Sequence, residues 1–303
     1  EQASGQVGPK SQSTGKFRQD GEREKPSSRL RKEGEAREDT VCEEQAARNK
    51  SLYQSLGRIY RRLVVPRILP RCRMVITVSQ FECDRIRTAL NFDPERIMAI
   101  HNGYNDRFRP MEGTAETVRK YLQDPEFLFF LGNTDPKKNT PGTLKAYAEY
   151  VRRSEKPLPL LVADLGEQPA EAILREIGEP RLRGMLRLAG YIPNSDLPAI
   201  YNEASAFLYT SLRESFGIPQ LEAMACGTPV VTSAASAIPE VAGQGAILVD
   251  PTDPTAIADA LLRLETDAAF RARQVAYGLE RVKRFSWEKT ARHLLTLYES
   301  LGK

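Results

Sequence analysis

The sequence predicts an α/β fold built on a doubly wound parallel sheet. From residue 127 onward, short apolar runs of strand length alternate with amphipathic stretches that have the helical period. Polar turns rich in Gly, Pro and Asn separate the two kinds of segment. Parallel strands need crossover connections, which are usually helices, so this alternation favours a parallel sheet covered by helices on both faces. Such sheets bind ligands in the crevice beyond the carboxyl ends of their strands.

Two further strands are expected before that region. The elements expected there are, in order, a helix over 52–64 that Pro66 and Pro70 end, a strand over 74–78, a helix from Ser79 to Leu90, a strand over 96–100 and a polar linker over 101–110. Proline ends the first helix because it lacks an amide hydrogen and its ring collides with the preceding turn. Ser79 is a favourable N-cap, because its hydroxyl accepts from an amide that has no partner within the helix.

The later elements follow from the same two patterns. The expected strands are 127–131, 158–162, 185–189, 206–209, 230–232 and 246–249. The expected helices are 139–152, 170–177, 195–204, 218–226, 254–264, 268–284 and 287–301, the last of them capped by Ser286.

The composition limits the classes of function. Mean hydropathy is −0.45, and no apolar run approaches the roughly 20 residues that span a bilayer. The polar N-terminus shows no secretory signal. A net charge of +4 is too small to predict nucleic-acid binding. The four cysteines have no C-x-x-C spacing, and two histidines assemble no familiar zinc site. These features predict a cytoplasmic protein without a structural metal.

The stretch from Glu214 to Gly227 carries the most chemical information. Gly217 gives a ligand a side-chain-free approach, and Pro219 suits the first turn of a helix that Gly227 can end. The free amides and positive dipole end of this helix suit a diphosphate. About one turn in, Glu222 could accept hydrogen bonds from a ribose diol, while Glu214 could hold hydroxyls of a sugar. The alternative interpretation is an ordinary α/β helix with two solvated glutamates.

These residues and their spacing resemble the E-x7-E signature of the retaining glycosyltransferases with the GT-B fold, in the large "group 1" (family 4-like) family. The further segments that agree with the family, in order, are 76–79, Asn102-Gly103, 132 through Lys138-Asn139, 190–192 and the helix beginning at Phe285-Ser-Trp. The resemblance covers most of residues 51–301 and is strongest over 127–249. It implies a Rossmann-like doubly wound sheet, the C-terminal donor-binding domain of a GT-B fold, with an incomplete N-terminal domain.

The resemblance also implies a role for each matching residue. Lys138 corresponds to the lysine that contacts the donor diphosphate, and Glu214 to the acid near the donor sugar, so these two are the expected catalytic residues. Asn133 stands at a donor-binding position usually held by arginine, so one positive charge is missing there. The other expected donor contacts are Tyr191 and Ile192 beside the nucleobase, the amides of Phe216, Gly217 and Ile218 at the sugar and phosphates, and Glu222 at the ribose.

The implied reaction is hexosyl transfer from a nucleotide sugar, such as a UDP- or GDP-sugar, to a glycan or lipid-linked acceptor, with retention of configuration, in polysaccharide biosynthesis. No metal is expected, because similar enzymes need none and the chain has no Asp-x-Asp cluster. One alternative is a truncated fragment that binds the nucleotide sugar but does not transfer it. A glycosidase that uses Glu214 and Glu222 as its carboxylate pair is a weaker alternative, because glycosidases need no phosphate-binding helix.

Four parts of the chain are expected. Residues 1–50 are rich in charged and polar residues and poor in apolar ones, so they are expected to be disordered or non-native. Residues 51–105 are the remnant of the N-terminal acceptor domain, 106–285 the nucleotide-sugar-binding domain and 286–303 a C-terminal helix. The basic helix over 51–69 has two interpretations: its arginines are solvated at the end of the acceptor domain, or they rest on an anionic membrane surface.

Overall fold

The structure, a computed structural model, describes Gly57, Tyr60 and residues 62–302. The segment 1–50 and most of the helix expected over 52–64 lie outside the described residues. The described end of that helix agrees with the predicted bound, since Arg62 and Leu63 are helical and a turn follows at Val64, but a short helix α3 (Val65–Ile68) comes next. Pro66 lies in the first turn of α3, where its missing amide hydrogen would have no helical partner, so Pro66 begins a helix instead of ending one.

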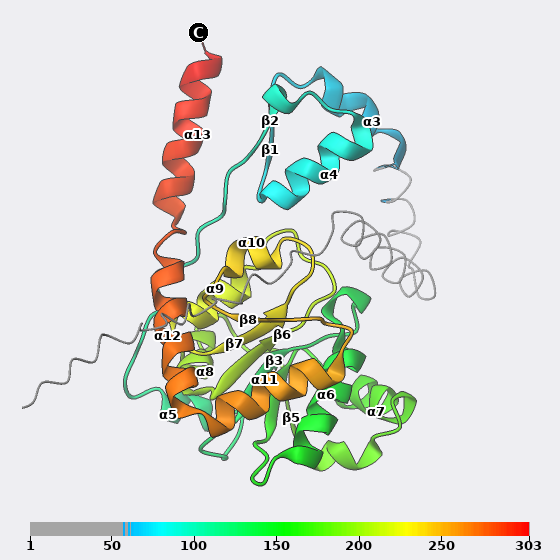
Figure 1. Ribbon diagram of the computed structural model, residues 1–303, viewed down its shortest axis with the longest axis vertical. Coiled ribbons are helices and arrows are strands. Elements are labelled where there is room, and N and C mark those ends of the chain that lie inside the picture. The colour runs from blue at the N-terminus through cyan, green and yellow to red at the C-terminus, as the bar shows by residue number, and fades with distance from the viewer. Residues whose placement is uncertain (1–56, 58–59, 61, 303) are drawn as a thin grey trace, which may run out of the picture.

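A two-stranded parallel sheet and its crossover helix form a small unit (residues 62–100). Its elements are β1 (Val75–Thr77), α4 (Gln80–Leu90) and β2 (Ile97–Ala99), as the sequence predicts. Ser79 caps α4, since its hydroxyl accepts from the amide three residues on at 3.3 Å. The core of the unit is small and consists of Val75, Cys83, Phe92 and Ile97. Figure 1 shows this unit in blue and cyan above the larger part of the molecule.

The larger part is built on a six-stranded sheet in which every neighbouring pair is parallel. Its strands are β3 (Leu128–Leu131), β4 (Leu160–Ala163), β5 (Leu186–Gly190), β6 (Ala206–Tyr209), β7 (Val230–Ser233) and β8 (Ile247–Val249). The spatial order is β5-β4-β3-β6-β7-β8. The chain therefore builds outward from β3 to one side, returns to the centre at β6, and builds outward to the other side. This is the doubly wound parallel sheet that the sequence predicts.

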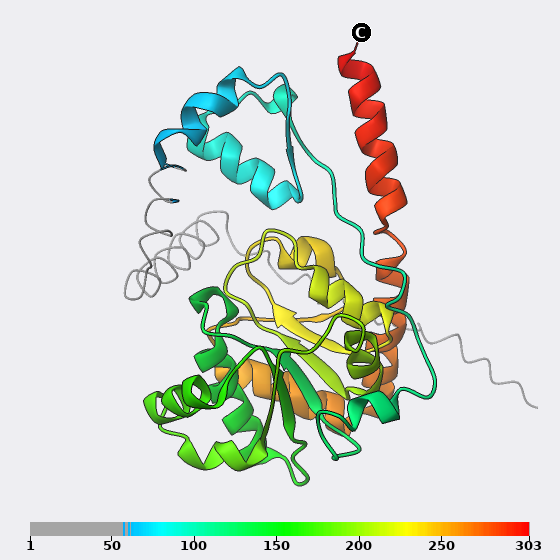
Figure 2. The same ribbon diagram turned by 180° about the vertical axis from the view of Figure 1, so that it is seen from behind.

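Helices cover both faces of this sheet (Figures 1 and 2). They are α5 (Ala115–Val118), α6 (Thr140–Arg153), α7 (Glu167–Glu176), α8 (Leu197–Glu203), α9 (Ile218–Ala225), α10 (Ile238–Ala242), α11 (Pro254–Thr266) and α12 (Ala268–Val282), while the last helix, α13 (Trp287–Leu301), extends away from the sheet. Leu128 and Phe130 of β3 pack on the face covered by α6, α7 and α11, whereas Phe129 packs on the face of α8, α9 and α10. The sequence does not predict α5 and α10, because so few residues show no helical period. Among the described helices, none combines the length and the apolar character that crossing a membrane requires.

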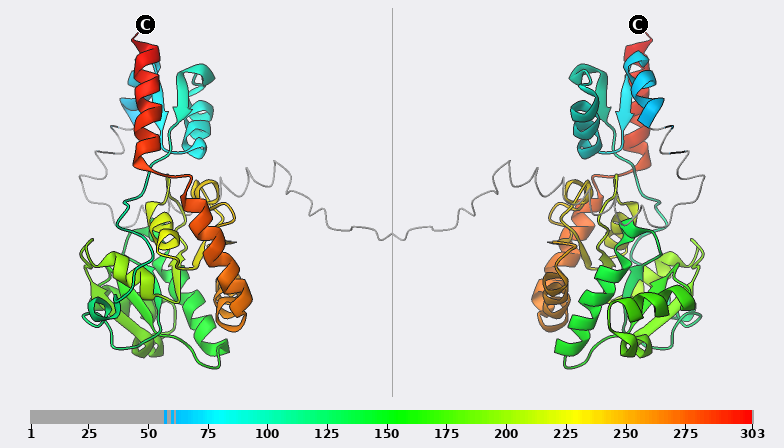
Figure 3. Two further views of the ribbon diagram at one scale, coloured as in Figure 1. Left: turned by 90° about the vertical axis from the view of Figure 1, so that its left-hand side faces the viewer. Right: turned by 90° about the vertical axis from the view of Figure 1, so that its right-hand side faces the viewer.

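The chain crosses itself where the small unit joins the larger sheet. The extended segment after β2 passes the start of α13, and a Cβ added at Gly103 would lie 2.2 Å from the backbone nitrogen of Trp287. The hydroxyl of Thr290 donates to the carbonyl of His101 at 2.6 Å across the same crossing. Helix α13 then runs beside the small unit, where its last turn accepts a hydrogen bond from that unit (Figure 3).

Candidate active site

Two loops meet at the centre of the larger sheet, where the strand order reverses. β3 and β6 are neighbours, but their crossovers lead to opposite sides, and doubly wound sheets bind ligands at such a point. The loop after β3 contains a 3-10 turn (Pro136–Lys138), and the loop after β6 leads into α9. The amide of Leu212 donates to the carbonyl of Lys137 at 2.8 Å. The side chain of Asn139 donates to the carbonyl of Thr210 at 3.1 Å, so the two loops are bonded together.

The expected catalytic pair lies across these two loops. The Lys138 ammonium donates to Glu214 Oε1 at 2.8 Å, and the two side chains are 26% and 20% exposed. The same ammonium lies 5.3 Å from the centre of the Tyr209 ring, within range of a cation–π interaction. Residues 76 positions apart in the sequence are therefore joined in a partly sheltered ion pair that solvent still reaches.

The backbone of Glu214 is fixed by hydrogen bonds to the segment that follows β7. Its amide donates to the hydroxyl of Ser236 at 2.9 Å, and its carbonyl accepts from the amide of Ala237 at 3.3 Å. The buried phenol of Tyr209 lies close enough to the Glu214 carboxylate to be affected by its charge. Burial, reinforced by that carboxylate, raises the pKa of Tyr209 well above its usual value, so the phenol stays protonated.

Gly217 begins α9 with backbone dihedrals that favour glycine. Its φ is 93°, and a Cβ at this position would lie 2.8 Å from Nε2 of Gln220 and 3.2 Å from the Tyr209 ring. The buried glycine therefore lets the chain turn tightly beneath the pair and start the helix there. The first amides of α9 have no partners within the helix and carry the positive end of its dipole.

Glu222 lies on α9, one turn from that start. Burial raises the pKa of its carboxyl from 4.5 to about 7, although the nearby Arg107 acts to lower it. The charges of Glu214 and Glu222 both act to raise the pKa of the buried Tyr209. The structure therefore gathers Lys138, Glu214, Gly217 and Glu222 at one end of the sheet.

The other predicted donor contacts are divided between this cluster and its surroundings. Asn133 uses its side-chain oxygen to accept from the amide of Asp135 at 2.8 Å, so it shapes the loop after β3. The ring of Phe216 is buried against His101 and Phe285, which leaves its backbone for a ligand. Ile218 opens α9 and is half-buried.

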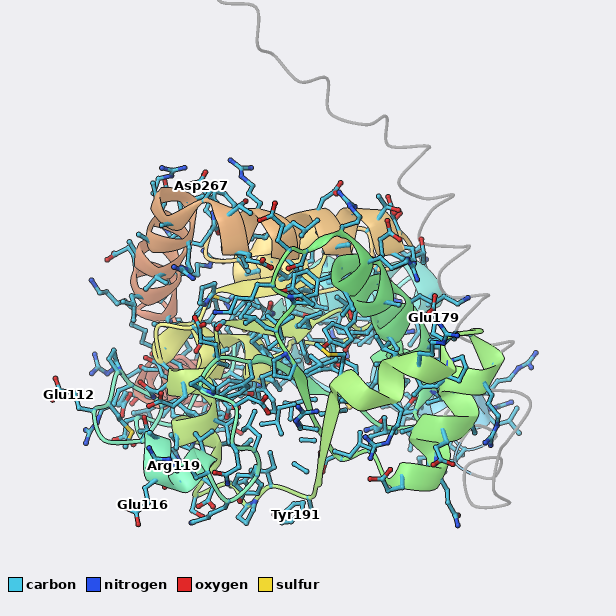
Figure 4. The ribbon with its side chains drawn as sticks, turned by 90° about the horizontal axis from the view of Figure 1, so that it is seen from below. Glu112, Glu116, Arg119, Glu179, Tyr191 and Asp267 are labelled. Carbon is cyan, nitrogen blue, oxygen red and sulfur yellow. The ribbon has the colours of Figure 1, made fainter. Side chains whose placement is uncertain are left out.

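Tyr191 and Ile192 lie apart from that cluster, after β5. Because β4 lies between β5 and β3, the strands that lead to their loop and to the loop of Lys138 are about 10 Å apart. Tyr191 is 74% exposed and lies at the periphery of the molecule in Figure 4, whereas Ile192 is buried in the core. An exposed ring on a rim is accessible to a flat ligand such as a base, but the side chain of Ile192 is not.

No metal centre is visible in the described part of the chain. Among these residues, no group of three or more His, Cys, Asp and Glu side chains is arranged so that it could hold an ion. Glu214 is paired with a lysine, and Glu222 has a carboxyl whose pKa is raised by burial. The arrangement is better suited to an anionic ligand bound by Lys138 and the helix amides than to a cation.

The comparisons with known proteins show the family. Residues 115–281 match the family described as "Glycosyl transferases group 1", and residues 43–108 match "Glycosyltransferase Family 4". The chain belongs to the group 1 glycosyltransferases. One relative, O-antigen chain mannosyltransferase B of Escherichia coli, is 31% identical over 237 residues, which are 77% of this chain and 62% of the relative. D-inositol 3-phosphate glycosyltransferase of Frankia alni is 33% identical over 68% of this chain and 53% of its own length.

Solved structures of glycosyltransferases share the fold. Sucrose-phosphate synthase from Thermosynechococcus elongatus superposes with a TM-score of 0.67 at 26% identity, over 79% of this chain and 61% of that one. Anabaena HepE in complex with UDP and glucose superposes with a TM-score of 0.66 at 18% identity, over 78% and 66%. The chain of this group 1 glycosyltransferase thus spans less than two thirds of the length of these relatives.

Some residues of the candidate site are recognised only in three dimensions. Tyr209 reads as one more buried strand residue, and Ser236 follows another strand with no recognisable motif. Ser236 has a φ of 54°, in the left-handed region that few residues other than glycine adopt, and nothing in the sequence predicts this conformation for a serine. Tyr209 is on β6, the strand that leads into the Glu214 loop, whereas Ser236 reaches Glu214 because β7, the strand before it, is adjacent to β6.

Proposed function

We propose that this chain binds a nucleotide-sugar donor at the carboxyl end of its six-stranded sheet and takes part in glycosyl transfer with retention of configuration. The observation that carries the proposal is the Lys138–Glu214 pair at the reversal of strand order, directly before the start of α9. Cationic and sugar-binding groups are then adjacent, as the diphosphate and the hexose are in a nucleotide sugar.

Each residue has a defined part in the proposal. Lys138 and the first amides of α9 bind the diphosphate and stabilise the charge that develops when the sugar–phosphate bond breaks. Glu214, oriented by Tyr209 and Ser236, accepts hydrogen bonds from hydroxyls of the donor sugar. Glu222 accepts from the ribose diol. The acceptor attacks from the face that the diphosphate leaves, without a protein nucleophile, and no protein-bound metal takes part.

The relatives support the class of donor but not its identity. One relative is named a mannosyltransferase, and HepE is crystallised with UDP and glucose. The likeness to HepE is one of fold alone, so both UDP- and GDP-sugars have to be tested. The names of these relatives do not favour the alternative of a binding fragment without transfer, and we therefore propose a transferase whose acceptor is a glycan or a lipid-linked glycan.

Binding is the first test. Calorimetry with UDP and GDP, in EDTA, should give saturable binding of at least one of them by the purified chain. A Lys138→Ala, Glu222→Gln double variant that binds equally well would remove the proposed site. Absence of binding in EDTA, with recovery in Mg²⁺, would contradict the metal-free part of the proposal alone.

Transfer is the second test. Release of UDP or GDP from UDP-glucose or GDP-mannose should rise when an oligosaccharide acceptor is added, and the anomeric configuration of the product should match that of the donor. If the chain binds the nucleotide sugar but no acceptor increases the release of UDP or GDP, the result would favour the binding fragment. Release of monosaccharide from a glycoside without a nucleotide would instead support a glycosidase.

A further inference from the structure

The first turn of α4, in the small unit, contacts the loop that carries Glu214. Glu82 Oε1 accepts from the hydroxyl of Ser215 at 2.9 Å and lies 3.6 Å from Nη2 of Arg213. Ser215 and Arg213 are the two chain neighbours of Glu214. The Glu82 side chain is 17% exposed and that of Arg213 is 30% exposed, whereas Ser215 is exposed, so water reaches part of this contact. Figures 1 and 2 show the lower end of α4 facing the loops at the carboxyl edge of the larger sheet.

A second carboxylate, on the larger part of the molecule, contacts the start of α4 in the small unit. Glu240 of α10 accepts from the amides of Gln80 and Phe81 at 2.8 and 3.0 Å, and from the imidazole of His101 at 2.6 Å. The two amides are the free donors at the start of α4, where the positive end of the helix dipole favours an anion. Burial acts to raise the pKa of Glu240, but the three hydrogen bonds outweigh it and lower that pKa, so the carboxylate is charged.

These contacts fix the backbone on both sides of one residue of the candidate site, Glu214. Arg213 and Ser215 on either side of Glu214 are held by Glu82, while the backbone of Glu214 itself is held by Ser236 and Ala237. Fixing the backbone of a residue costs conformational entropy, and a site that is already fixed does not lose this entropy when the ligand binds. Contacts that come from a separate unit can therefore change how well Glu214 is oriented.

We propose that the first turn of α4 is a clamp on the Glu214 loop and that Glu82 is a positioning residue for Glu214. The hold of the site on the donor sugar then depends on how the small unit is seated. This inference rests on the proposed function, in which Glu214 contacts the sugar and Lys138 and Glu222 contact the nucleotide. It follows that loosening the clamp should affect the sugar more than the nucleotide.

The test compares two affinities in each variant by calorimetry: that of UDP or GDP, whichever binds, and that of UDP-glucose or GDP-mannose with the same base. Glu82→Ala should lower the affinity for the nucleotide sugar by about three- to tenfold, the equivalent of one hydrogen bond, and leave the nucleoside diphosphate within about twofold. Asp84→Ala is the matched control, because Asp84 is on the same helix but bonds to Gln80 and Arg87 within it. This control should change neither affinity.

Two further variants separate positioning from folding. Glu82→Gln keeps an acceptor for Ser215 but loses the charge that faces Arg213, so it should recover part of the lost affinity. Ser215→Ala should have much less effect in a Glu82→Ala background than alone, because the two variants remove the same bond. If Glu82→Ala fails to fold, Glu82→Gln takes its place and Asp84→Asn is the control. The affinity for the nucleotide sugar should then fall by less, but still by more than the affinity for the nucleoside diphosphate.

A ligand-free measurement distinguishes the clamp from the proposed function. Amide hydrogen exchange over residues 210–217 should be faster in Glu82→Ala than in Asp84→Ala. Equal exchange in the two variants, or equal losses of nucleotide and nucleotide-sugar affinity in Glu82→Ala, would overturn the clamp. Faster exchange in a protein that binds no nucleotide would leave the clamp standing and overturn the proposed function.

Discussion

At the scale of the residue, Lys138 is the centre of the candidate site, because its ammonium contacts both the Glu214 carboxylate and the face of Tyr209. Lys138→Ala should weaken nucleoside diphosphate binding by about 1.5–3 kcal/mol, the range for hydrogen bonds to charged groups. Calorimetry measures the loss. Lys137→Ala is the control, since the Lys137 side chain is exposed and its carbonyl, which Leu212 uses, is retained. A similar loss in both variants would indicate a general effect of charge.

Glu222 should make stability depend on pH. Its folded-state pKa is raised to about 7 by burial, so its stabilising contribution is present below the unfolded value of about 4.5 and is lost as the pH rises through 7. Glu222→Gln cannot ionise, and it should be more stable than the parent by about 1–3 kcal/mol near pH 8. Urea unfolding at several pH values measures this difference, which should disappear near pH 4. A difference that is constant with pH would mean that the carboxyl is not the cause.

Glu222 should also make ligand binding depend on pH. The carboxylate accepts from a ribose diol better than the protonated acid does, so ribonucleotide affinity should rise between about pH 6 and 8. A 2′,3′-dideoxynucleotide lacks the diol and should show no such rise, and neither should Glu222→Gln. Calorimetry across this range, in buffers of matched ionic strength, separates the cases. Equal losses for both nucleotides in Glu222→Gln would contradict the ribose assignment.

At the scale of the element, the start of α9 depends on Gly217. Gly217→Ala would place a Cβ against Gln220 and Tyr209 at a φ of 93°, so it should cost about 2–4 kcal/mol and weaken nucleoside diphosphate binding. Gly178→Ala is the control, because Gly178 has a φ of 79° but no atom within 4 Å of an added Cβ. It should cost about 1 kcal/mol, the strain of the dihedral alone. Thermal unfolding and calorimetry measure the two effects, and equal costs would show that packing at Gly217 adds nothing.

At the scale of the whole molecule, the crossing between the segment after β2 and the start of α13 joins the small unit to the larger sheet. Gly103→Ala would force a Cβ into the backbone of Ser286 and Trp287, so it should destabilise the protein by at least about 2 kcal/mol. Gly184→Ala, in open space, is the control. The clamp predicts a further consequence: amide exchange over 210–217 should also rise in Gly103→Ala, since Glu82 would be displaced with the small unit.

The sequence predicts the strands of the larger sheet and the residues that we expect to bind a donor at its carboxyl edge. The alternation of apolar strands and amphipathic helices predicts the six strands and their parallel direction, because buried strands and their crossover helices leave a local periodic pattern. The stretch from Glu214 to Glu222 predicts the tight turn at Gly217 and the helix that starts after it, because both features depend on residues that are neighbours in the sequence. The prediction that Pro66 ends a helix is wrong. Proline occurs both in the first turn of a helix and just after a helix end, and the sequence pattern does not distinguish the two positions.

How that site is held depends on contacts that the sequence does not predict. The bond between Lys138 and Glu214, the support of Glu214 by Ser236, and the contact of Glu82 with Ser215 all join residues that are distant in the sequence. The strand order and the seating of the small unit bring these groups together, and a periodic pattern encodes neither. A hydrogen bond needs two atoms within about 3 Å, and a sequence motif fixes the position of only one of them.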